Sequence, residues 1–263
     1  MAETNGRDRI QSIERGVAVL RAFSGHEISL TVADIASRVG LARPVVRRIL
    51  ITFEHLGYAI VANGAWRLTP KVLEIGSGYF SASSLPEISY GYMSSLADAT
   101  GATCSVGVLD GFEVIHVARI EAQRPLPDAV RIGQHLPSHA TATGHVLLAG
   151  QTPEAVDALI REAGDLEAFT PQTIVDGDAL RARVDEVRSR GFDVSNEEYL
   201  PGQVAAAVPI AVGDEVVGAL TLSSTTVRQT ERSLTEEAVP RMLESAAGIA
   251  SAYRNANPHL FRR

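Results

Sequence analysis

Three arginines, Arg43, Arg47 and Arg48, fall at the start of a segment with helical periodicity. Arginine side chains read guanine edges in the major groove and pair with backbone phosphates. A recognition helix presents such side chains from its N-terminal end. No Ser, Thr, Asp or Asn stands at the capping position, so the first backbone N–H groups are free to bind a phosphate. This chemistry is typical of DNA recognition.

Two helices and a tight turn must position these arginines. The first helix is predicted over 31–39, with Thr31 as its N-cap, Asp34 as the capping partner and Gly40 as its end. The second begins at Pro44, which suits a first helical position and holds Arg43 extended. One side of this second helix carries an apolar stripe, which comprises Val46, Ile49, Leu50, Phe53 and Leu56. The arginines therefore lie on the opposite side.

A short hairpin is predicted to follow. Residues 58–61 and 65–68 are β-prone and flank Asn63-Gly64, which is typical of a two-residue turn. With an earlier helix over 10–23, these elements make a winged helix-turn-helix. The predicted partner is double-stranded operator DNA, and the predicted contacts are Arg43, Pro44, Val45, Arg47, Arg48, Thr52 and Arg67. The alternative is that the three arginines merely form a solvated face, which would be the better interpretation of an isolated run of charges. The ordered set of cap, glycine turn, proline start, basic face and hairpin favours DNA binding instead.

A second group of residues with useful chemistry, Ser138, Thr141, Thr143 and Gly144, lies at the start of an apolar helix that ends at Ala149. A small organic acid needs a cavity with apolar walls and a few donors aimed at its carboxylate. The start of this helix offers backbone N–H groups, a positive dipole end and hydroxyls, and Gly144 allows close approach. The sequence therefore predicts an effector site at this position. A purely structural role, with Thr141 as the N-cap and Thr143 as a packing residue, would account for the two threonines equally well.

Other motifs favour no further chemistry. His135, His139 and His145 crowd the same stretch, but no Cys or carboxylate stands at ligand spacing, so we predict no metal. Ser138 and His139 lack the G-x-S-x-G turn of a hydrolase, so we predict no catalytic residue. Cys104 lies in an apolar strand and is expected in the core or in a pocket wall. We predict no cofactor.

The charge is unevenly divided along the 263 residues, whose net charge is −7. Residues 1–75 carry 10 Arg and Lys against 7 Asp and Glu, a charge of +3, whereas residues 76–263 carry 14 against 24, a charge of −10. DNA would repel such an acidic body everywhere except at its basic head. An architectural DNA-binding protein without an effector is therefore disfavoured.

The chain also carries features of an intracellular protein. Its single cysteine excludes an intramolecular disulfide and suits a reducing cytoplasm. Residues 1–9 lack the apolar core of a signal peptide, and no apolar run is long enough to span a bilayer. We expect a cytoplasmic protein with no membrane partner.

The remainder of the chain alternates helices with strands that pair in hairpins. Strands are predicted over 102–109, 113–120, 129–132, 192–196, 204–212 and 216–223. A loop is predicted over 134–141, and helices over 69–79, 88–100, 153–162, 178–190 and 233–255 besides the one that ends at Ala149. This pattern predicts an α+β domain with one antiparallel sheet and helices packed on it.

Composition also predicts the domain boundaries. Thr69-Pro70 is a cap and start for a short linker helix. The small-residue stretch over 81–86 is typical of an interdomain boundary. We predict a winged helix-turn-helix domain over 1–68, a linker helix and boundary over 69–86, and an effector-binding domain over 87–263.

Three motifs in order resemble the IclR family of transcriptional regulators. The first combines 11–20 with 41–50 and Leu56-Gly57-Tyr58, the second is 137–149, and the third lies within 196–209. Residues 68–76, 108–111 and 116–119 are similar to the PcaR/PobR group, which regulates aromatic catabolism through protocatechuate and β-ketoadipate. The likeness spans nearly the whole chain.

The resemblance implies a GAF-like effector domain that binds a small organic acid, and a homodimer joined through the DNA-binding domains, often as a dimer of dimers. It adds pocket residues from the second motif, the central strands and the segment near Glu197, namely Cys104, Val106, Val117, Arg119, His139, Glu197, Tyr199 and Ser223. For Arg119, a surface ion pair with Glu121 is at least as good an account. His145 departs from the family, which usually carries Lys or Arg there, so any contact of His145 with an acid would depend on pH.

The chain is therefore predicted to be a DNA-binding transcriptional regulator, and not an enzyme, that responds to a small organic acid of aromatic catabolism. The alternative is a small-molecule metabolic enzyme with an appended winged helix as an interaction module. Turnover of the acid would indicate an enzyme, whereas stoichiometric binding and unchanged release would indicate a sensor.

Overall fold

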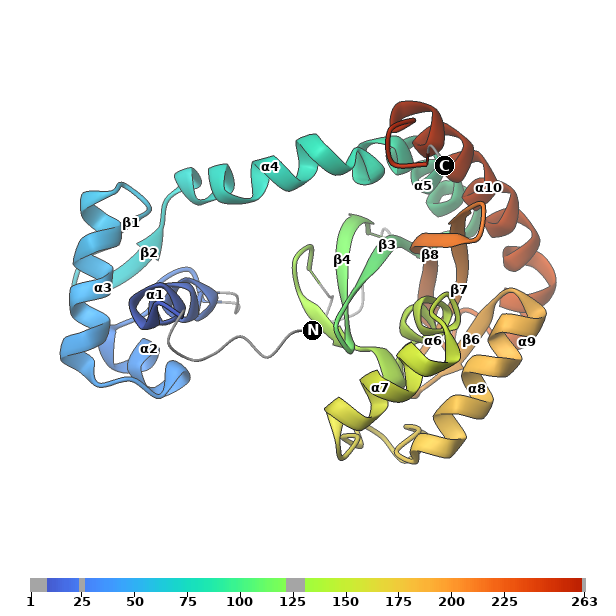
Figure 1. Ribbon diagram of the computed structural model, residues 1–263, viewed down its shortest axis with the longest axis horizontal. Helices are drawn as coiled ribbons and strands as arrows, with labels where there is room; N and C mark the ends of the chain where they lie inside the picture. The colour runs from blue at the N-terminus through green and yellow to red at the C-terminus, as the bar shows by residue number, and fades with distance from the viewer. Residues whose placement is uncertain (1–8, 24–26, 122–130, 262–263) are drawn as a thin grey trace. The chain divides into compact units, whose positions relative to one another are not determined.

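The computed structural model describes residues 9–23, 27–121 and 131–261. It divides into two compact units, Met1–Ala82 and Ser83–Arg263. Figure 1 labels the helices and strands of both units. Each unit has its own hydrophobic core.

Three helices form the core of the smaller unit, namely α1 (Gln11–Arg21), α2 (Val32–Val39) and α3 (Arg43–His55). Apolar side chains at helical spacing meet between them, and Val19, Ile35 and Leu50 have no exposed surface. Burial of a side chain of this size stabilises a fold by roughly 1.5–3 kcal/mol. This packing fixes which face of α3 is turned outward.

The predicted caps of α2 are confirmed. Thr31 Oγ1 accepts a hydrogen bond from the Asp34 backbone N–H (3.2 Å), and the Thr31 N–H donates to Asp34 Oδ2 (2.9 Å). Gly40 ends the helix with a φ of 66°, a conformation that glycine adopts at little cost. In contrast, α3 begins at Arg43, one residue earlier than predicted, because the extended residue before the helix is Ala42.

The end of α3 departs from the predicted apolar stripe. The helix ends at His55, and Leu56 is 47% exposed rather than packed in the core. Lys71 Nζ donates to the carbonyl oxygen of Leu56 (3.0 Å) and lies over the ring of Tyr58. A cation therefore stands at the negative end of the helix, where it is electrostatically favourable.

The predicted hairpin is present as β1 (Ala59–Ala62) and β2 (Ala65–Leu68), which pair antiparallel. Asn63 and Gly64 join the strands with φ values of 52° and 76°. Both values lie in the left-handed region that a two-residue hairpin turn of this kind requires. The predicted wing is therefore confirmed.

The chain leaves the wing through the 3₁₀ turn η1 (Pro70–Val72) and the helix α4 (Leu73–Ser83). Thr69 caps this segment as predicted, since its Oγ1 accepts a hydrogen bond from the Lys71 N–H (3.3 Å). The helix continues to Ser83, past the predicted end at 79.

The larger unit is built on a six-stranded antiparallel sheet with the order β5-β4-β3-β8-β7-β6. Its strands are β3 (Thr103–Asp110), β4 (Glu113–Ile120), β5 (His135–Pro137), β6 (Asp193–Asn196), β7 (Gln203–Val212) and β8 (Glu215–Thr225). All except β5 were predicted to within two residues. β5 forms within the segment predicted as a loop, whereas the strand predicted over 129–132 lies partly outside the described residues, and residues 131–132 are not in a strand.

Helices cover both faces of this sheet (Figure 1). α5 (Leu85–Thr100) and α10 (Val239–Ala256) pack on one face and form an extensive core with it. α6 (Ala142–Ala149) packs on the other face, with α8 (Gly177–Arg190) against it and α7 (Pro153–Ala163) against α8. The predicted α+β class is confirmed. No helix among the described residues is both long enough and apolar enough to cross a membrane.

The C-terminal helix is more irregular than predicted. A single helix was expected over 233–255, but α9 (Glu231–Ser233) leads into a π-helical turn, Leu234–Ala238, before α10 begins. Pro240 lies in the first turn of α10. Because proline has no backbone N–H, it cannot complete the regular hydrogen-bond pattern of an α-helix, which accounts for the irregular turn before it.

The start of α6 packs directly on the backbone of the 3₁₀ turn η2 (Ser138–Ala140). A Cβ atom added to Gly144 would lie 2.2 Å from the carbonyl oxygen of Ser138. The sequence predicts a ligand beside Gly144, but the backbone of Ser138 fills that space. Gly144 is therefore required by close packing within the protein.

We expect Gly144→Ala to lower the free energy of unfolding by about 1–3 kcal/mol or more, because backbone must move to admit the methyl group. Gly91→Ala is the matched control, since Gly91 lies in α5 and a Cβ there would meet no atom within 4 Å. That change should be neutral or stabilising by up to about 1 kcal/mol. Equilibrium urea unfolding measures both variants, and equal stability of the two would contradict this account.

Candidate functional site

The outer face of α3 carries the side chains predicted to contact DNA. Arg43, Arg47 and Arg48 are exposed, as are Pro44 and Thr52, and Val45 is half-buried. Arg67 is exposed on β2. No ion pair among the described residues uses any of the three α3 arginines. The helix also begins without a side-chain cap, so its first N–H groups remain available to an anion.

A cavity in the larger unit lies between α6 and the sheet. About 520 Å³ of space, part of it open to solvent, is left between the side chains that line it. They are His116, Arg119, Leu136, Ala140, Thr141, Ala142, Thr143, Ser195, Tyr199, Gln203, Ala205, Thr221 and Ser223. A guanidinium, an imidazole and several hydroxyls on otherwise small apolar walls suit a small polar organic molecule.

The cavity brings together some of the predicted effector residues and not others. Those that line it are Arg119, Thr141, Thr143, Tyr199 and Ser223. Those that do not are Cys104, Val106, Val117, Ser138, His139, Gly144 and Glu197. The polar lining residues that the sequence did not single out are His116, Ser195, Gln203 and Thr221.

Strand alternation explains why Cys104 and Val106 lie elsewhere. Both are fully buried in the core on the opposite face of the sheet, under α5 and α10. Ser105 between them pairs with Arg119 on one side and Thr221 on the other, so it shares their face. Burial raises the pKa of the Cys104 thiol to about 12, which makes it an unreactive core residue. The alternation of small polar with apolar residues along β3 was the sequence feature that could have identified the face of the sheet that lines the cavity.

A β-bulge explains the position of Val117. Val106 pairs with Ala118 and Gly107 pairs with His116, so Val117 is an extra residue on β4. Val117 packs in the core on the opposite face. The bulge therefore places His116 and Arg119 on the same face, although an unbroken strand would turn them to opposite sides.

Arg119 has a largely buried side chain with few partners among the described residues. Its side chain is 9% exposed, and its only hydrogen bond to a described residue runs from Nη1 to Ser105 Oγ at 3.3 Å. Nε lies 3.7 Å from Glu121 Oε1 but makes no hydrogen bond there. Burial lowers the pKa of Arg119, and the nearby carboxylate of Glu121 opposes this effect only in part. The ion pair with Glu121 that the sequence offered as an alternative is therefore present, but it is long and leaves Nε without an acceptor among the described residues.

The two threonines at the start of α6 serve both as structural groups and as cavity wall. Thr141 Oγ1 accepts a hydrogen bond from the Gly144 N–H (3.1 Å), so it is the N-cap. Thr143 Oγ1 lies 2.8 Å from Thr221 Oγ1 across the cavity wall. The Ala142 N–H donates to Ser195 Oγ (3.3 Å). Because the protein itself uses these helix N–H groups, Arg119 is the stronger candidate for binding an anion.

The other residues of the predicted motif support the cavity from outside. Ser138 Oγ donates to the carbonyl oxygen of Phe112 (2.8 Å). His139 stacks parallel to the Phe112 ring and contacts the Glu167 carbonyl oxygen through Nε2 (2.9 Å). Glu197 adopts a φ of 56°, and its carboxylate accepts from the Gly202 N–H (3.0 Å). These contacts shape the loops beside the cavity.

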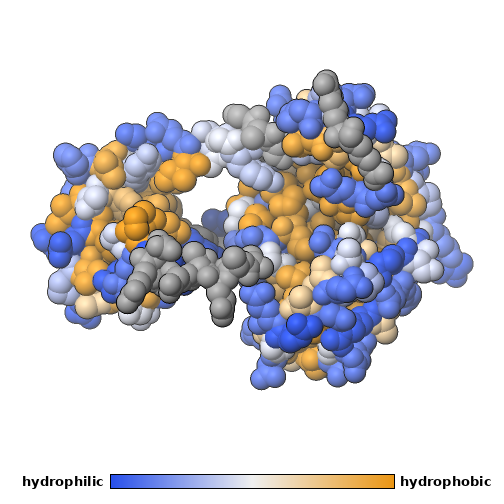
Figure 2. All heavy atoms as spheres, viewed as in Figure 1, coloured by the Kyte–Doolittle hydropathy of each residue, from blue (hydrophilic) through white to orange (hydrophobic). Residues whose placement is uncertain are grey.

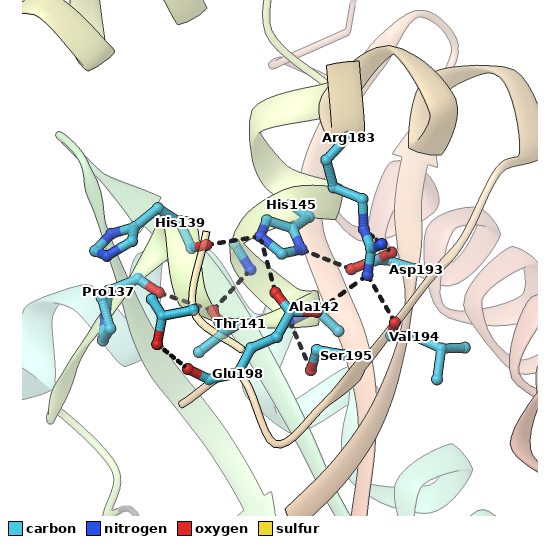
Figure 3. Close-up of polar contacts among 12 residues, drawn as sticks. Pro137, His139, Thr141, Ala142, His145, Arg183, Asp193, Val194, Ser195 and Glu198 are labelled. Atoms are coloured by element: carbon cyan, nitrogen blue, oxygen red, sulfur yellow. Dashed lines mark hydrogen bonds and ion pairs between the residues drawn. The ribbon is translucent and has the colours of Figure 1, made fainter. Parts of the chain in front are cut away.

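A buried ionic network lies next to the cavity and involves His145 (Figure 3). His145 Nδ1 lies 2.7 Å from Asp193 Oδ2, and Nε2 lies 2.9 Å from the carbonyl oxygen of His139. Arg183 and Arg190 reach Asp193 Oδ1 at 2.9 and 2.6 Å. Arg183 also pairs with Glu198 at 3.1 Å. His145 is not among the residues that line the cavity, and both of its ring nitrogens are engaged within the network.

The charges of this network stabilise one another. Burial by itself would lower the pKa of His145, but the hydrogen bond and charge of Asp193, with Glu198, raise it overall. For Asp193, burial acts to raise the pKa, while His145 and the two arginines lower it overall. Burial raises the pKa of Glu198. His145 and Asp193 therefore form a charged pair inside the protein.

Two family descriptions match the chain. The IclR helix-turn-helix domain matches residues 12–59, and the bacterial transcriptional regulator IclR C-terminal domain matches residues 78–251. The first match contains α1, α2 and α3, and the second contains the cavity. Together they contain α3 and all the residues that line the cavity, whereas β2 with Arg67 lies between the two matches.

Relatives of known name agree with these matches. The p-hydroxybenzoate hydroxylase transcriptional activator of Acinetobacter baylyi is 33% identical over 250 residues, which cover 93% of this chain and 92% of the relative. A transcriptional regulator from Rhodococcus sp. RHA1 is 33% identical with a TM-score of 0.82, and the match covers 95% of this chain and 100% of that one. An IclR homolog from Microbacterium hydrocarbonoxydans, complexed with 4-hydroxybenzoate, shares the fold at 23% identity with a TM-score of 0.80, over 93% of this chain and 99% of that one.

Asp193→Asn should lower the free energy of unfolding at pH 7 by about 3–5 kcal/mol, because the buried His145 loses the carboxylate at its Nδ1 and two arginines lose one of their two carboxylate partners. The matched control is Asp157→Asn, whose partner Arg181 is 40% exposed and whose loss should cost less than about 1 kcal/mol. Since the pKa of Asp193 is lowered on folding, its contribution is present above pH 3.8 and lost as the pH falls through the folded-state value. Urea unfolding across this pH range measures the difference; the same loss in both variants would contradict the assignment.

Proposed function

Since the chain belongs to the IclR family of bacterial transcriptional regulators, we propose that it binds its operator as a homodimer and that a hydroxylated aromatic acid in the cavity controls that binding. The family and the named relatives are transcriptional regulators, so the chain is a regulator and not a metabolic enzyme with an appended winged helix. In this proposal, residues 1–68 bind DNA, residues 69–86 link the domains and residues 87–263 bind the effector.

The observation that carries the effector proposal is the state of Arg119. A guanidinium in a cavity, with 9% of its side chain exposed and Nε without a hydrogen-bond acceptor among the described residues, has lost most of the contact with solvent that stabilises a cation. A carboxylate supplies both the opposite charge and two acceptor oxygens for the planar guanidinium. An organic acid therefore fits the cavity better than a neutral or cationic molecule.

The lining of the cavity supports an aromatic acid with hydroxyl groups. Leu136, Ala140 and Ala205 give apolar wall, and Thr143, Thr221 and Ser223 add hydroxyls. The relative from Acinetobacter is named for activating p-hydroxybenzoate hydroxylase, and the homolog from Microbacterium was solved with 4-hydroxybenzoate. Both names agree with the resemblance to the PcaR/PobR group. We therefore assign the effector to the hydroxybenzoate and protocatechuate class.

An apolar patch on the smaller unit supports the homodimer. Ile10, Ile13 and Val17 recur at helical spacing along α1 and are 60%, 60% and 51% exposed. In Figure 2, hydrophobic residues are visible on the surface of this unit over α1. Grouped exposed apolar side chains mark protein interfaces. A second copy would cover the patch through a two-fold axis and would supply the second recognition helix for a palindromic site.

Control by an effector requires that the acid bind two arrangements of the domains with different affinity. α4 runs from the wing to Ser83 and is the covalent connection between the DNA-binding and effector domains. A change in the effector domain on closing around the acid would therefore be passed to the recognition helices through this segment.

We expect Arg119→Gln to weaken binding of 4-hydroxybenzoate or 3,4-dihydroxybenzoate by at least roughly tenfold, because a charged hydrogen bond is lost. Isothermal titration calorimetry with the full-length protein measures the dissociation constants. Arg241→Gln, which changes an exposed arginine on α10, should leave them unchanged. Wild-type protein that binds neither acid, or an Arg119 variant that binds both normally, would overturn the effector assignment.

We expect the double variant Arg47→Ala with Arg48→Ala to lose roughly tenfold or more in DNA affinity, because base-edge and phosphate contacts disappear together. The probe is a duplex selected by wild-type protein from a random-sequence library, and a gel-shift titration gives the affinity. Sedimentation velocity should show the same dimer in the variant and the wild type, since the change removes no apolar side chain of the α1 patch, although Arg48 lines a groove beside Ile13. Unchanged affinity would remove these arginines from the reading surface, and a monomeric wild type would refute the homodimer.

A further inference from the structure

The cavity contains a second polar side chain that the protein leaves unsatisfied. His116 is 5% exposed, and neither ring nitrogen has a hydrogen-bond partner among the described residues. Buried polar groups without partners are destabilising and therefore uncommon in native proteins. A buried imidazole that lines a ligand cavity in this state indicates that the ligand supplies its partner.

We propose that His116 hydrogen-bonds a ring hydroxyl of the effector while Arg119 binds the carboxylate, so that the cavity selects hydroxylated aromatic acids over unsubstituted ones. This inference rests on the proposed function and adds to it the residue that determines specificity.

The bulge in β4 gives the two groups the spacing that this role needs. His116 pairs with Gly107 and Arg119 pairs with Ser105, and these two partners are neighbours on the same face of β3. Same-face neighbours on a strand are about 7 Å apart. The two side chains therefore start from neighbouring positions on the cavity face, where one small aromatic acid can reach both. A regular strand would have turned one of the two side chains away from the cavity.

The absence of a side chain at Gly107 leaves room for this arrangement. A Cβ atom there would lie 2.7 Å from Thr143 Cγ2 and 3.3 Å from His116 Cδ2. The imidazole and the Thr143 side chain therefore meet over a bare stretch of strand. Thr143 Oγ1 is already engaged with Thr221, so it competes less well than His116 for a new hydroxyl.

The protonation state of His116 favours a hydroxyl over a second carboxylate. Burial, with a further contribution from the charge of Arg119, lowers the pKa of His116 to about 4. The ring is therefore neutral at pH 7 and presents one N–H donor and one acceptor nitrogen. A phenolic hydroxyl can satisfy either of them, whereas a carboxylate would find only the single donor and no positive charge on the ring.

The expected consequence is a preference measured as a ratio of dissociation constants. A site built to hydrogen-bond a hydroxyl rejects the analogue that lacks it, because its own polar atoms are then left unpaired. Benzoate should therefore bind wild-type protein roughly ten- to a hundredfold more weakly than the best of 2-, 3- and 4-hydroxybenzoate.

His116→Phe keeps a planar ring and removes both nitrogens, so it isolates the hydrogen bond. In this variant, calorimetry with the full-length protein should give dissociation constants for benzoate and for the best hydroxybenzoate whose ratio is near one. Affinity for the hydroxybenzoate falls, whereas affinity for benzoate is kept. His116→Gln restores a donor and an acceptor and should recover part of the ratio. His135→Phe, a matched change at a histidine that pairs with Glu113 outside the cavity, should leave the ratio unchanged.

The outcomes separate this inference from the proposed function. If His116→Phe keeps the wild-type ratio while Arg119→Gln weakens all the acids, the effector assignment stands and the role of His116 is refuted. A wild-type protein that binds benzoate as tightly as every hydroxybenzoate also refutes it. If no acid binds the wild-type protein, both proposals fail. Melting temperatures of the variants within a few degrees of wild type exclude misfolding as the cause of a lost ratio.

Discussion

The ion pairs of Asp193 are the interactions on which the geometry of the larger unit depends. This carboxylate has no exposed surface and is held by His145 from α6 and by Arg183 and Arg190 from α8. A charge buried so completely is tolerated only when it is paired this fully. Ser195, two residues along β6, contacts the start of α6 and lines the cavity. The network therefore fixes the distance between α6 and the sheet, and with it the cavity.

This network also explains how a histidine can occupy the position where the related family usually carries Lys or Arg. Both ring nitrogens of His145 are engaged inside the protein, with Asp193 and with the carbonyl oxygen of His139. Its positive charge is neutralised there and does not reach the cavity. In the proposed function, recognition of an acid consequently falls to Arg119, which lines the cavity from β4. His145 serves the architecture here, and the cation proposed to face the ligand comes from a different element.

The sequence predicted those parts of the fold that depend on local rules. Two examples are the capping box of α2, formed by Thr31 and Asp34, and the hairpin turn at Asn63-Gly64. Each depends only on residues within three positions along the chain, so the sequence alone predicts it. The cavity face of the sheet was harder to predict, because helices cover both faces and burial hides the alternation that separates Cys104 from Ser105. His116 was missed because a bulge is a feature of pairing between two strands. The role of Gly144 depends on a backbone contact that no periodicity encodes.

The cavity contains the electrostatic basis of the proposed response to an acid. Arg119 and His116 are both withdrawn from solvent there without full compensation by the described residues, and this desolvation is unfavourable. A carboxylate removes that cost only in an arrangement that keeps it against the guanidinium. In the proposed mechanism the acid therefore binds an arrangement that holds it against the guanidinium more tightly than one that does not, which is the condition for shifting an equilibrium. A neutral molecule of the same shape would fill the space without this differential affinity, so we expect the sign of the ligand charge, more than its shape, to determine the response.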